Sequence, residues 1–274
     1  MGNERHAMGN ERHAMGSERH AMSIETSILR GVFTIEIARP EKKNALTVAM
    51  YSAMTAAIRK AEAETEVQAL LITGQPGVFT AGNDLADFMK QPPTGEDSPV
   101  FQFMYALAEC EKPVVAAVTG AAVGIGVTML LHCDLVYIGT DARLSLPFVS
   151  LGLVPEFGSS LLLPRLMGQV QAAEKLLVGE PFTAAEAVRC GLANAECPPG
   201  EVLARARGAA ERFSTLPAGA VRDSKRLLRA GSREQVLSTI RAEAAVFSQR
   251  LHSAEAREAF QAFFEKRQPD FSKC

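Results

Sequence analysis

The chain has 274 residues and a formal net charge of only −2, so its charge gives no basis for binding nucleic acid. Its longest largely apolar stretch, residues 121–131, is well short of the roughly 20 residues that cross a bilayer, and we expect no membrane association. The five cysteines are scattered without a CxxC pair, which favours reduced thiols and a cytoplasmic protein.

The first 22 residues are three near-copies of one heptad, MGNERHA, followed by Met22. Such polar units cannot bury a hydrophobic core, so we interpret residues 1–22 as a tag-like, disordered segment. The remaining chain is long enough for one domain with a small appendage.

Strands and helices are expected to alternate after this segment. Alternating polar and apolar side chains predict a strand over residues 28–37, and an apolar stripe predicts a helix over residues 48–63. Two short apolar runs, residues 69–73 and 114–118, predict buried parallel strands.

Each of these two runs leads through a glycine-bearing turn toward a helix, the first opened by Asp84 and the second covering residues 127–132. Further strands are predicted over residues 135–138 and 144–146, so the order is that of an α/β protein with a parallel sheet. After Gly158 the pattern becomes mainly helical. The other predicted elements are helices over residues 100–110, 161–166, 170–178, 184–190, 202–214, 219–229, 233–249 and 254–266, and an extended piece over 192–195.

Two of the glycine turns offer free backbone N–H groups. Their sequences are AGND at residues 81–84 and VGIG at residues 123–126. The first N–H groups of a helix lack internal partners and lie at the positive end of its dipole, so such a turn can hold an anion or a developing oxyanion. Ordinary tight turns remain the alternative at this point. The second turn lacks the third glycine of a dinucleotide-binding motif.

No metal site is predicted. His132 and Cys133 are adjacent, and adjacent residues on a helix point in different directions, which does not suit zinc. On an apolar helix, His132 is expected to be a hydrogen-bonded core residue and Cys133 a small buried one.

Six segments carry a resemblance to a known family: residues 39–46, 78–85, 119–135, 144–160, 176–192 and 263–271. In order, they resemble those of the enoyl-CoA hydratase/isomerase family, the crotonases. The resemblance implies a crotonase-like ββα spiral core over residues 23–210 that holds an acyl-CoA site, and a helical C-terminal trimerisation region over residues 211–274. It also implies an acyl-CoA thioester substrate, no cofactor besides the coenzyme A within that substrate, and a homotrimer or hexamer.

The resemblance further implies the residues of the site. In this family two backbone N–H groups bind the thioester oxygen, and the matching positions here are Asn83 and Ile125. Lys43, with Lys42, is placed near the coenzyme A phosphates, although a solvated charge pair is the alternative. Other residues expected to contact substrate are Ala81, Gly82, Asp84, Leu85 and Gly124, of which Asp84 is also a candidate helix cap. Candidates for an acyl tunnel are Met89, Phe101, Met104 and Phe148, although apolar residues at such spacings more often belong to the core.

The two glutamates that hold a water in the typical hydratases of the family are missing. The matching positions are Thr128, which we expect to line the pocket, and Phe148. A hydroxyl and a phenyl ring cannot hold and deprotonate a water as paired carboxylates do. Ordinary hydratase activity is therefore not expected.

Glu156 is an acid in a suggestive position, within an apolar run just before a predicted helix. Burying an unpaired carboxylate is costly, so its presence calls for a reason. The segment resembles that of peroxisomal-type Δ3,Δ2-enoyl-CoA isomerases, while a helix cap or a solvent-facing glutamate is the alternative. We expect burial to raise the pKa of Glu156 and hypothesise that it is the single base of a 3-enoyl-CoA to 2-enoyl-CoA isomerase. Enoyl-CoA hydration or another crotonase reaction of fatty acid β-oxidation, and a non-catalytic acyl-CoA-binding module, are the competing hypotheses.

Overall fold

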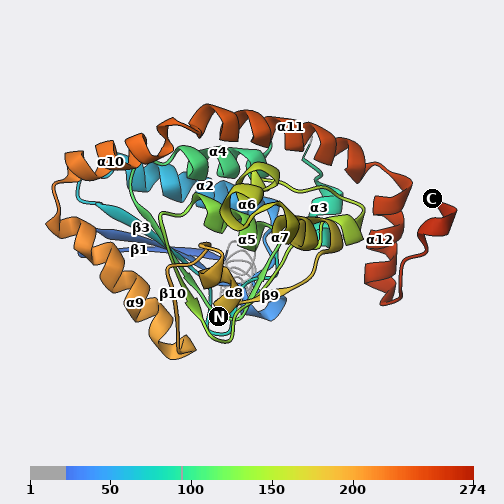
Figure 1. Cartoon of the computed structure of the whole chain (residues 1–274), viewed down its shortest axis with the longest axis horizontal. Coiled ribbons are helices and arrows are strands. Elements are labelled where there is room, and N and C mark those ends of the chain that lie inside the picture. Colours follow the sequence, from blue (N-terminus) through green and yellow to red (C-terminus); the bar gives the residue numbers. More distant parts are fainter. Residues whose placement is uncertain (1–22, 94) are drawn as a thin grey trace, which may run out of the picture.

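The computed structural model describes residues 23–93 and 95–274 (Figure 1). The repeated heptads, and with them the prediction that residues 1–22 are disordered, lie outside the described residues.

The larger sheet has six strands in the order β1-β2-β3-β5-β7-β10. All of its pairings are parallel except that of β1 with β2. The buried apolar runs at residues 69–73 and 114–118 form its centre, as predicted. The strands are β1 (Ile24–Leu29), β2 (Val32–Ile37), β3 (Ala69–Thr73), β5 (Val114–Val118), β7 (Leu135–Gly139) and β10 (Ala195–Cys197).

The single strand predicted over residues 28–37 is wrong, because this stretch contains the turn of a hairpin. Leu29 pairs with Val32, and the two residues between them, Arg30 and Gly31, have φ angles of 51° and 76°. Positive φ at both central residues suits a two-residue hairpin turn. Alternation continues across the turn in the sequence, which hides the reversal.

A smaller sheet of four strands, in the order β4-β6-β8-β9, lies beside the larger one. Two of its strands, β4 and β6, occupy stretches that the sequence predicted only as glycine turns. The chain at Gly120 passes close to the chain at Gly77. A Cβ built on Gly120 would lie 1.7 Å from the carbonyl oxygen of Gly77, so glycine suits this position. The strands are β4 (Val78–Thr80), β6 (Ala121–Val123), β8 (Arg143–Ser145) and β9 (Phe182–Thr183).

The two sheets are built by a repeated unit. A strand of the larger sheet (β3, β5 or β7) is followed by a strand of the smaller sheet (β4, β6 or β8), and then by a helix. This repetition is the predicted ββα spiral. The helices that close the three units are α3 (Leu85–Lys90), α5 (Ile125–Thr128) and the 3-10 turn η3 (Val149–Leu151).

The helix predicted over residues 127–132 is α5 followed by a 3-10 turn, η2 (Met129–His132). It starts two residues earlier than predicted, at Ile125, because Gly124 turns the chain with a φ of 56°. Val127 and Met129 are fully buried, which agrees with a core position.

Helices cover both faces of the larger sheet. Helices α2 (Val48–Ala63) and α4 (Pro99–Glu109) pack on each other over one face, and α9 (Pro199–Arg212) packs on the other face against β3, β5 and β7 (Figure 1). The α9 face has its own small core, which includes Val202, Ala206 and Ala210.

The second half of the chain is mainly helical, as predicted. Residues 174–178 form a π-helical turn where a regular helix was predicted, and the extended piece lies at β10, slightly after its predicted position. Helices α10 and α11 run across the top of the molecule in Figure 1, and α12 follows at one end. The remaining helices are α6 (Ser159–Met167), α7 (Gln169–Ala173), α8 (Ala184–Arg189), α10 (Ala218–Ala230), α11 (Arg233–Leu251) and α12 (Ala254–Glu265).

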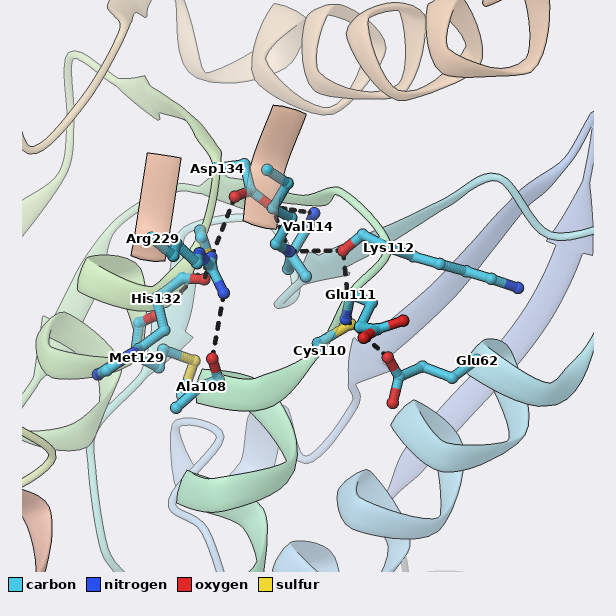
Figure 2. Close-up of polar contacts among 12 residues, drawn as sticks. Glu62, Ala108, Cys110, Glu111, Lys112, Val114, Met129, His132, Asp134 and Arg229 are labelled. Carbon is cyan, nitrogen blue, oxygen red and sulfur yellow. Dashed lines mark hydrogen bonds and ion pairs between the residues drawn. The ribbon is translucent and has the colours of Figure 1, made fainter. Parts of the chain in front are cut away.

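Helix α10 is attached to the core by a partly buried charged cluster (Figure 2). Lys225, which is 6% exposed, donates to Asp134 Oδ2 at 2.7 Å and to the Lys112 carbonyl at 2.6 Å. Arg229 donates to Asp134 Oδ1 at 3.0 Å and to the His132 carbonyl at 2.8 Å. The cluster joins the C-terminal helices to the loop between η2 and β7.

No helix in residues 23–93 or 95–274 is long and apolar enough to cross a membrane.

Candidate active site

A cavity of about 600 Å³ lies where the three ββα units meet helices α11 and α12. Every residue predicted to bind or act on the thioester lines it except Thr128, and of the four acyl-tunnel candidates Phe148 lines it. The lining comprises Lys42, Lys43, Ala45, Ala81, Gly82, Asn83, Asp84, Leu85, Ala86, Phe88, Val123, Gly124, Ile125, Pro147, Phe148, Ser150, Leu151, Leu153, Glu156, Phe247, Phe263 and Phe264.

The backbone N–H of Asn83 is free within this cavity. On either side of it, Leu46 N–H donates to the Gly82 carbonyl at 2.8 Å and Asp84 N–H donates to the Leu46 carbonyl at 2.8 Å. These two bonds fix the chain around Asn83, while its own N–H has no acceptor in the part of the chain that the structure describes. The AGND turn therefore presents one backbone donor to the cavity.

The backbone N–H of Ile125 is a second donor of the same kind. Ile125 is the first residue of α5, so its N–H has no acceptor within the helix. Gly124 is held by its N–H bond to the Ser145 carbonyl at 2.9 Å, and its own carbonyl accepts from Val127 and Thr128.

The two turns approach each other closely. A Cβ built on Gly82 would lie 2.9 Å from the Val123 carbonyl oxygen, and Gly82 has a φ of 86°, so glycine suits this position in both space and conformation. The close approach brings the Asn83 and Ile125 donors into one cavity. Two backbone N–H groups in one apolar cavity can bind the oxygen of a polarised carbonyl group.

Glu156 is the acid of this cavity. Its side chain is 4% exposed, and its Oε1 atom has no hydrogen-bond partner among residues 23–93 and 95–274. Burial, and then the negative charge of Glu243, raise the pKa of Glu156 from 4.5 to about 8. The predicted direction of this shift is confirmed.

The two structural alternatives for Glu156 are wrong. A solvent-facing position is excluded by its burial. Helix α6 has Gly158 as its N-cap residue, and the side chain that reaches its first N–H groups is that of Glu243. Glu156 is thus a buried carboxyl group without a capping role, which makes it a candidate for proton transfer.

Asp84 lines the cavity but is engaged elsewhere. Its side chain accepts from the Asp87 N–H at 3.2 Å, which caps α3, and forms an ion pair with Arg39 at 2.8 Å. Partial burial raises the pKa of Asp84, but the hydrogen bonds from Arg39 and the backbone outweigh it and hold this pKa below its usual value. The predicted cap is confirmed.

Three of the predicted tunnel residues and Thr128 do not line the cavity. Phe101 and Met104 are core residues of α4, and Met89 is 51% exposed. Thr128 is fully buried on α5, and its Oγ1 atom has no hydrogen-bond partner in the described ranges. Phe148 is the tunnel residue that lines the cavity. For Phe101 and Met104 the core alternative is thus confirmed, because apolar spacing does not distinguish a helix face that meets the core from one that meets a cavity.

His132 is a core residue, as predicted. It is 4% exposed, its Nε2 atom lies 2.7 Å from the Phe157 carbonyl oxygen, and its ring stacks on that of Phe157 at 4.0 Å between centroids. Burial, the largest cause, lowers the pKa of His132 to about 4. The neutral imidazole therefore supports the residue next to Glu156.

Two residues near the site were missed by sequence reasoning. Tyr51 lies in the buried stripe of α2 and donates its hydroxyl to Asn83 Oδ1 at 2.5 Å. Glu243 occupies a core position of α11, on the same side as Ile240 and Phe247. A polar group within an apolar stripe was the available signal, because such a group needs a partner when it is buried.

The fold and this cavity define a crotonase, and the chain belongs to the enoyl-CoA hydratase/isomerase family. Residues 27–273 match the family model described as Enoyl-CoA hydratase/isomerase, which confirms the resemblance seen in the sequence.

Three similar proteins illustrate the range of the family. The structure of Pseudomonas aeruginosa OdaA is 52% identical, has a TM-score of 0.86 and covers 88% of this chain and 98% of that chain. A relative from Rhodobacter capsulatus named Probable enoyl-CoA hydratase is 33% identical over 91% of this chain and 98% of its own length. A Homo sapiens relative named Enoyl-CoA delta isomerase 2 is 32% identical over 86% of this chain and 62% of its own length. The family is thus established, whereas the two named relatives carry the names of different reactions, hydration and double-bond isomerisation.

Proposed function

We propose that this protein is a Δ3,Δ2-enoyl-CoA isomerase, which moves the double bond of a 3-enoyl-CoA to position 2. The observation that carries the proposal is a single available carboxylate. Of the two acids that line the cavity, Asp84 is paired with Arg39, whereas Glu156 has no cationic partner in the described part of the chain. The positions that match the two hydratase glutamates are Thr128 and Phe148, and neither can act as a base.

In the proposed reaction, the thioester oxygen accepts hydrogen bonds from the N–H groups of Asn83 and Ile125. The ionised Glu156 removes a proton from C2, and the electron pair spreads over the thioester and the adjacent double bond as a dienolate. Glu156 then returns the same proton to C4, so that no proton is gained or lost. Each donor contributes about 3 kcal/mol of transition-state stabilisation in comparable sites.

The rest of the cavity serves to bind the substrate. Lys42 and Lys43 are exposed at its edge, where they are available for the phosphates of coenzyme A. Phe148 and Leu153 supply apolar surface for the acyl chain. We propose no cofactor beyond the coenzyme A of the substrate. Ala81, Gly82, Leu85 and Gly124 would shape the wall around the thioester.

We also propose assembly through the C-terminal helical region, residues 211–274, as a homotrimer or hexamer, and a cytoplasmic location. Leu227 and Leu228 on α10 are 74% and 87% exposed in the single chain, and burial against another subunit would remove this apolar surface from water. A reducing compartment suits the five cysteines, which are all free thiols.

Enoyl-CoA hydration is the second candidate, because the Rhodobacter capsulatus relative bears that name. It would require one carboxylate to activate water without the usual second one. A non-catalytic acyl-CoA-binding module is the third candidate.

The test offers 3-enoyl-CoA and 2-enoyl-CoA in parallel to the wild type, to Glu156→Gln and to the control Glu180→Gln, whose side chain is exposed. We expect the wild type and the control to isomerise 3-enoyl-CoA, and Glu156→Gln to lose at least about a hundredfold in kcat. Retained isomerisation in Glu156→Gln would remove the mechanism. Fast hydration of 2-enoyl-CoA without isomerisation would support the second candidate, and tight binding without turnover the third.

A further inference from the structure

The loop that carries Glu156 is held from outside the ββα core by Glu243 of helix α11. Glu243 Oε2 accepts the Gly158 N–H at 2.6 Å, and Oε1 accepts the Ser160 N–H at 2.9 Å and the Ser160 hydroxyl at 2.5 Å. Glu243 is only 8% exposed. Both of its oxygens are thus used to hold the chain just after Glu156.

The backbone of this loop needs such support. Phe157 and Gly158 have φ angles of 60° and 73°, so two successive residues are left-handed, and one of them is not glycine. A bulky residue in this conformation costs free energy and persists only where its surroundings fix it. The His132 ring holds the Phe157 carbonyl on one side, and Glu243 holds the Gly158 N–H on the other.

We infer that Glu243 is a positioning residue for the reaction: from the C-terminal helical region it fixes the backbone that carries Glu156, and so determines where the Glu156 carboxylate stands relative to the two N–H donors. This inference rests on the proposed role of Glu156 as the base. A misplacement of about 1 Å in a catalytic group can cost about a hundredfold in rate, so a residue that prevents it has a measurable effect.

Glu243 also acts on Glu156 through its charge. After burial, the charge of Glu243 is the next cause that raises the pKa of Glu156. Tyr51 on α2 is coupled to Glu156 by charge, and His132 on η2 contacts the carbonyl of the neighbouring Phe157; both are buried. Asp84 lines the same cavity but is paired with Arg39. Removal of the Glu243 charge should therefore lower the pKa of Glu156 and move the rising part of the pH–rate profile to lower pH.

The test compares Glu243→Gln, Ser160→Ala and the control Glu234→Gln, an exposed position on the same helix. Glutamine keeps the size of Glu243 but offers one acceptor oxygen in place of two, and its NH₂ group opposes a backbone donor. For Glu243→Gln we expect kcat on 3-enoyl-CoA to fall about tenfold with KM within about twofold, and the rising part of the kcat profile to move to lower pH. Ser160→Ala removes only one of the three bonds, so its kcat should fall less, with no shift in pH. Glu234→Gln should match the wild type.

The inference would be overturned if Glu243→Gln lost thermal stability but kept the kcat and pH profile of the wild type, because Glu243 would then be only structural. If Glu243→Gln does not fold, Ser160→Ala decides, and wild-type kcat in this variant contradicts the inference. Carbon-13 NMR of the Glu156 carboxyl group in the substrate-free protein measures the effect of Glu243 on the Glu156 pKa independently of catalysis. A lower Glu156 pKa in Glu243→Gln supports the coupling even if no isomerase activity is found, and an unchanged pKa contradicts it.

Discussion

The Tyr51 hydroxyl donates a hydrogen bond of 2.5 Å to Oδ1 of Asn83, a residue that lines the cavity. Tyr51 comes from helix α2 and Asn83 from the turn after β4, so the bond joins the AGND turn to helix α2. Burial, and then the charge of Glu156, raise the pKa of Tyr51, so the hydroxyl stays protonated and remains a donor.

Replacing Tyr51 with Phe should therefore loosen the Asn83 turn. The change removes the hydroxyl and leaves Asn83 Oδ1 without its donor, at a cost of about 1 kcal/mol in the free energy of unfolding. We expect a several-fold loss in kcat with a smaller change in KM, as measured by urea unfolding and steady-state kinetics. Tyr137→Phe is the control, because the Tyr137 hydroxyl has no hydrogen-bond partner in the described chain. Equal effects of the two changes would contradict the proposed support of Asn83.

The pH dependence of the reaction should follow Glu156. A base acts in its ionised form, and the pKa of Glu156 in the substrate-free protein is about 8. The kcat/KM for 3-enoyl-CoA should therefore rise with pH and level off above about 8, since this ratio reports the free enzyme. A profile that is already flat around pH 6 would contradict this assignment.

The same shift has a consequence for stability. The folded protein holds the Glu156 proton more tightly than the unfolded chain, whose value is near 4.5, so the free energy of unfolding should fall as pH rises from about 4.5 to about 8. Glu156→Gln removes this dependence. The variant should be more stable than the wild type above pH 8, and the advantage should shrink toward pH 4.5 in denaturant titrations. An advantage that is constant across this range would argue against a raised pKa.

Gly120 should not tolerate a side chain. It has a φ of 63°, and a Cβ on it would lie 1.7 Å from the Gly77 carbonyl oxygen, between β5 and β6. Gly120→Ala should therefore destabilise the fold by about 3 kcal/mol or more. Gly208→Ala is the matched control, because nothing lies within 4 Å of a Cβ there and the residue is inside helix α9, where alanine should stabilise by up to about 1 kcal/mol. Thermal unfolding measures both, and the two changes should have opposite signs.

Lys225→Met should separate α10 from the core. The change removes the buried donor to Asp134 and to the Lys112 carbonyl. The negative charge of the Asp134 carboxylate is then less well neutralised. We expect a loss of about 3 kcal/mol in the free energy of unfolding. The control Arg226→Ala breaks an exposed ion pair with Asp223 and should change this energy by less than about 1 kcal/mol. A small effect of Lys225→Met in urea unfolding would show that the cluster in Figure 2 does not hold the helix.

Local patterns determined much of the fold in advance. The apolar stripe of α2 and the buried runs of β3 and β5 were predicted with bounds that agree closely with the structure, because each pattern repeats with the period of its own element. The short strands β4 and β6 were missed. Each has only three residues, and its stability comes from pairing with a distant strand, which leaves no periodic signal.

By itself, the sequence determined the family, the glycine turns and the acid at position 156, because these depend on residue types at short spacing. Only the tertiary structure decided that Asn83 and Ile125 face one cavity, that Thr128 does not, and that Glu156 is buried with an unpartnered oxygen. It also showed that the residue holding the Glu156 loop is Glu243, which is 85 positions from Gly158. Packing brings such groups together from separate elements, and no local pattern records which buried polar group will meet which partner.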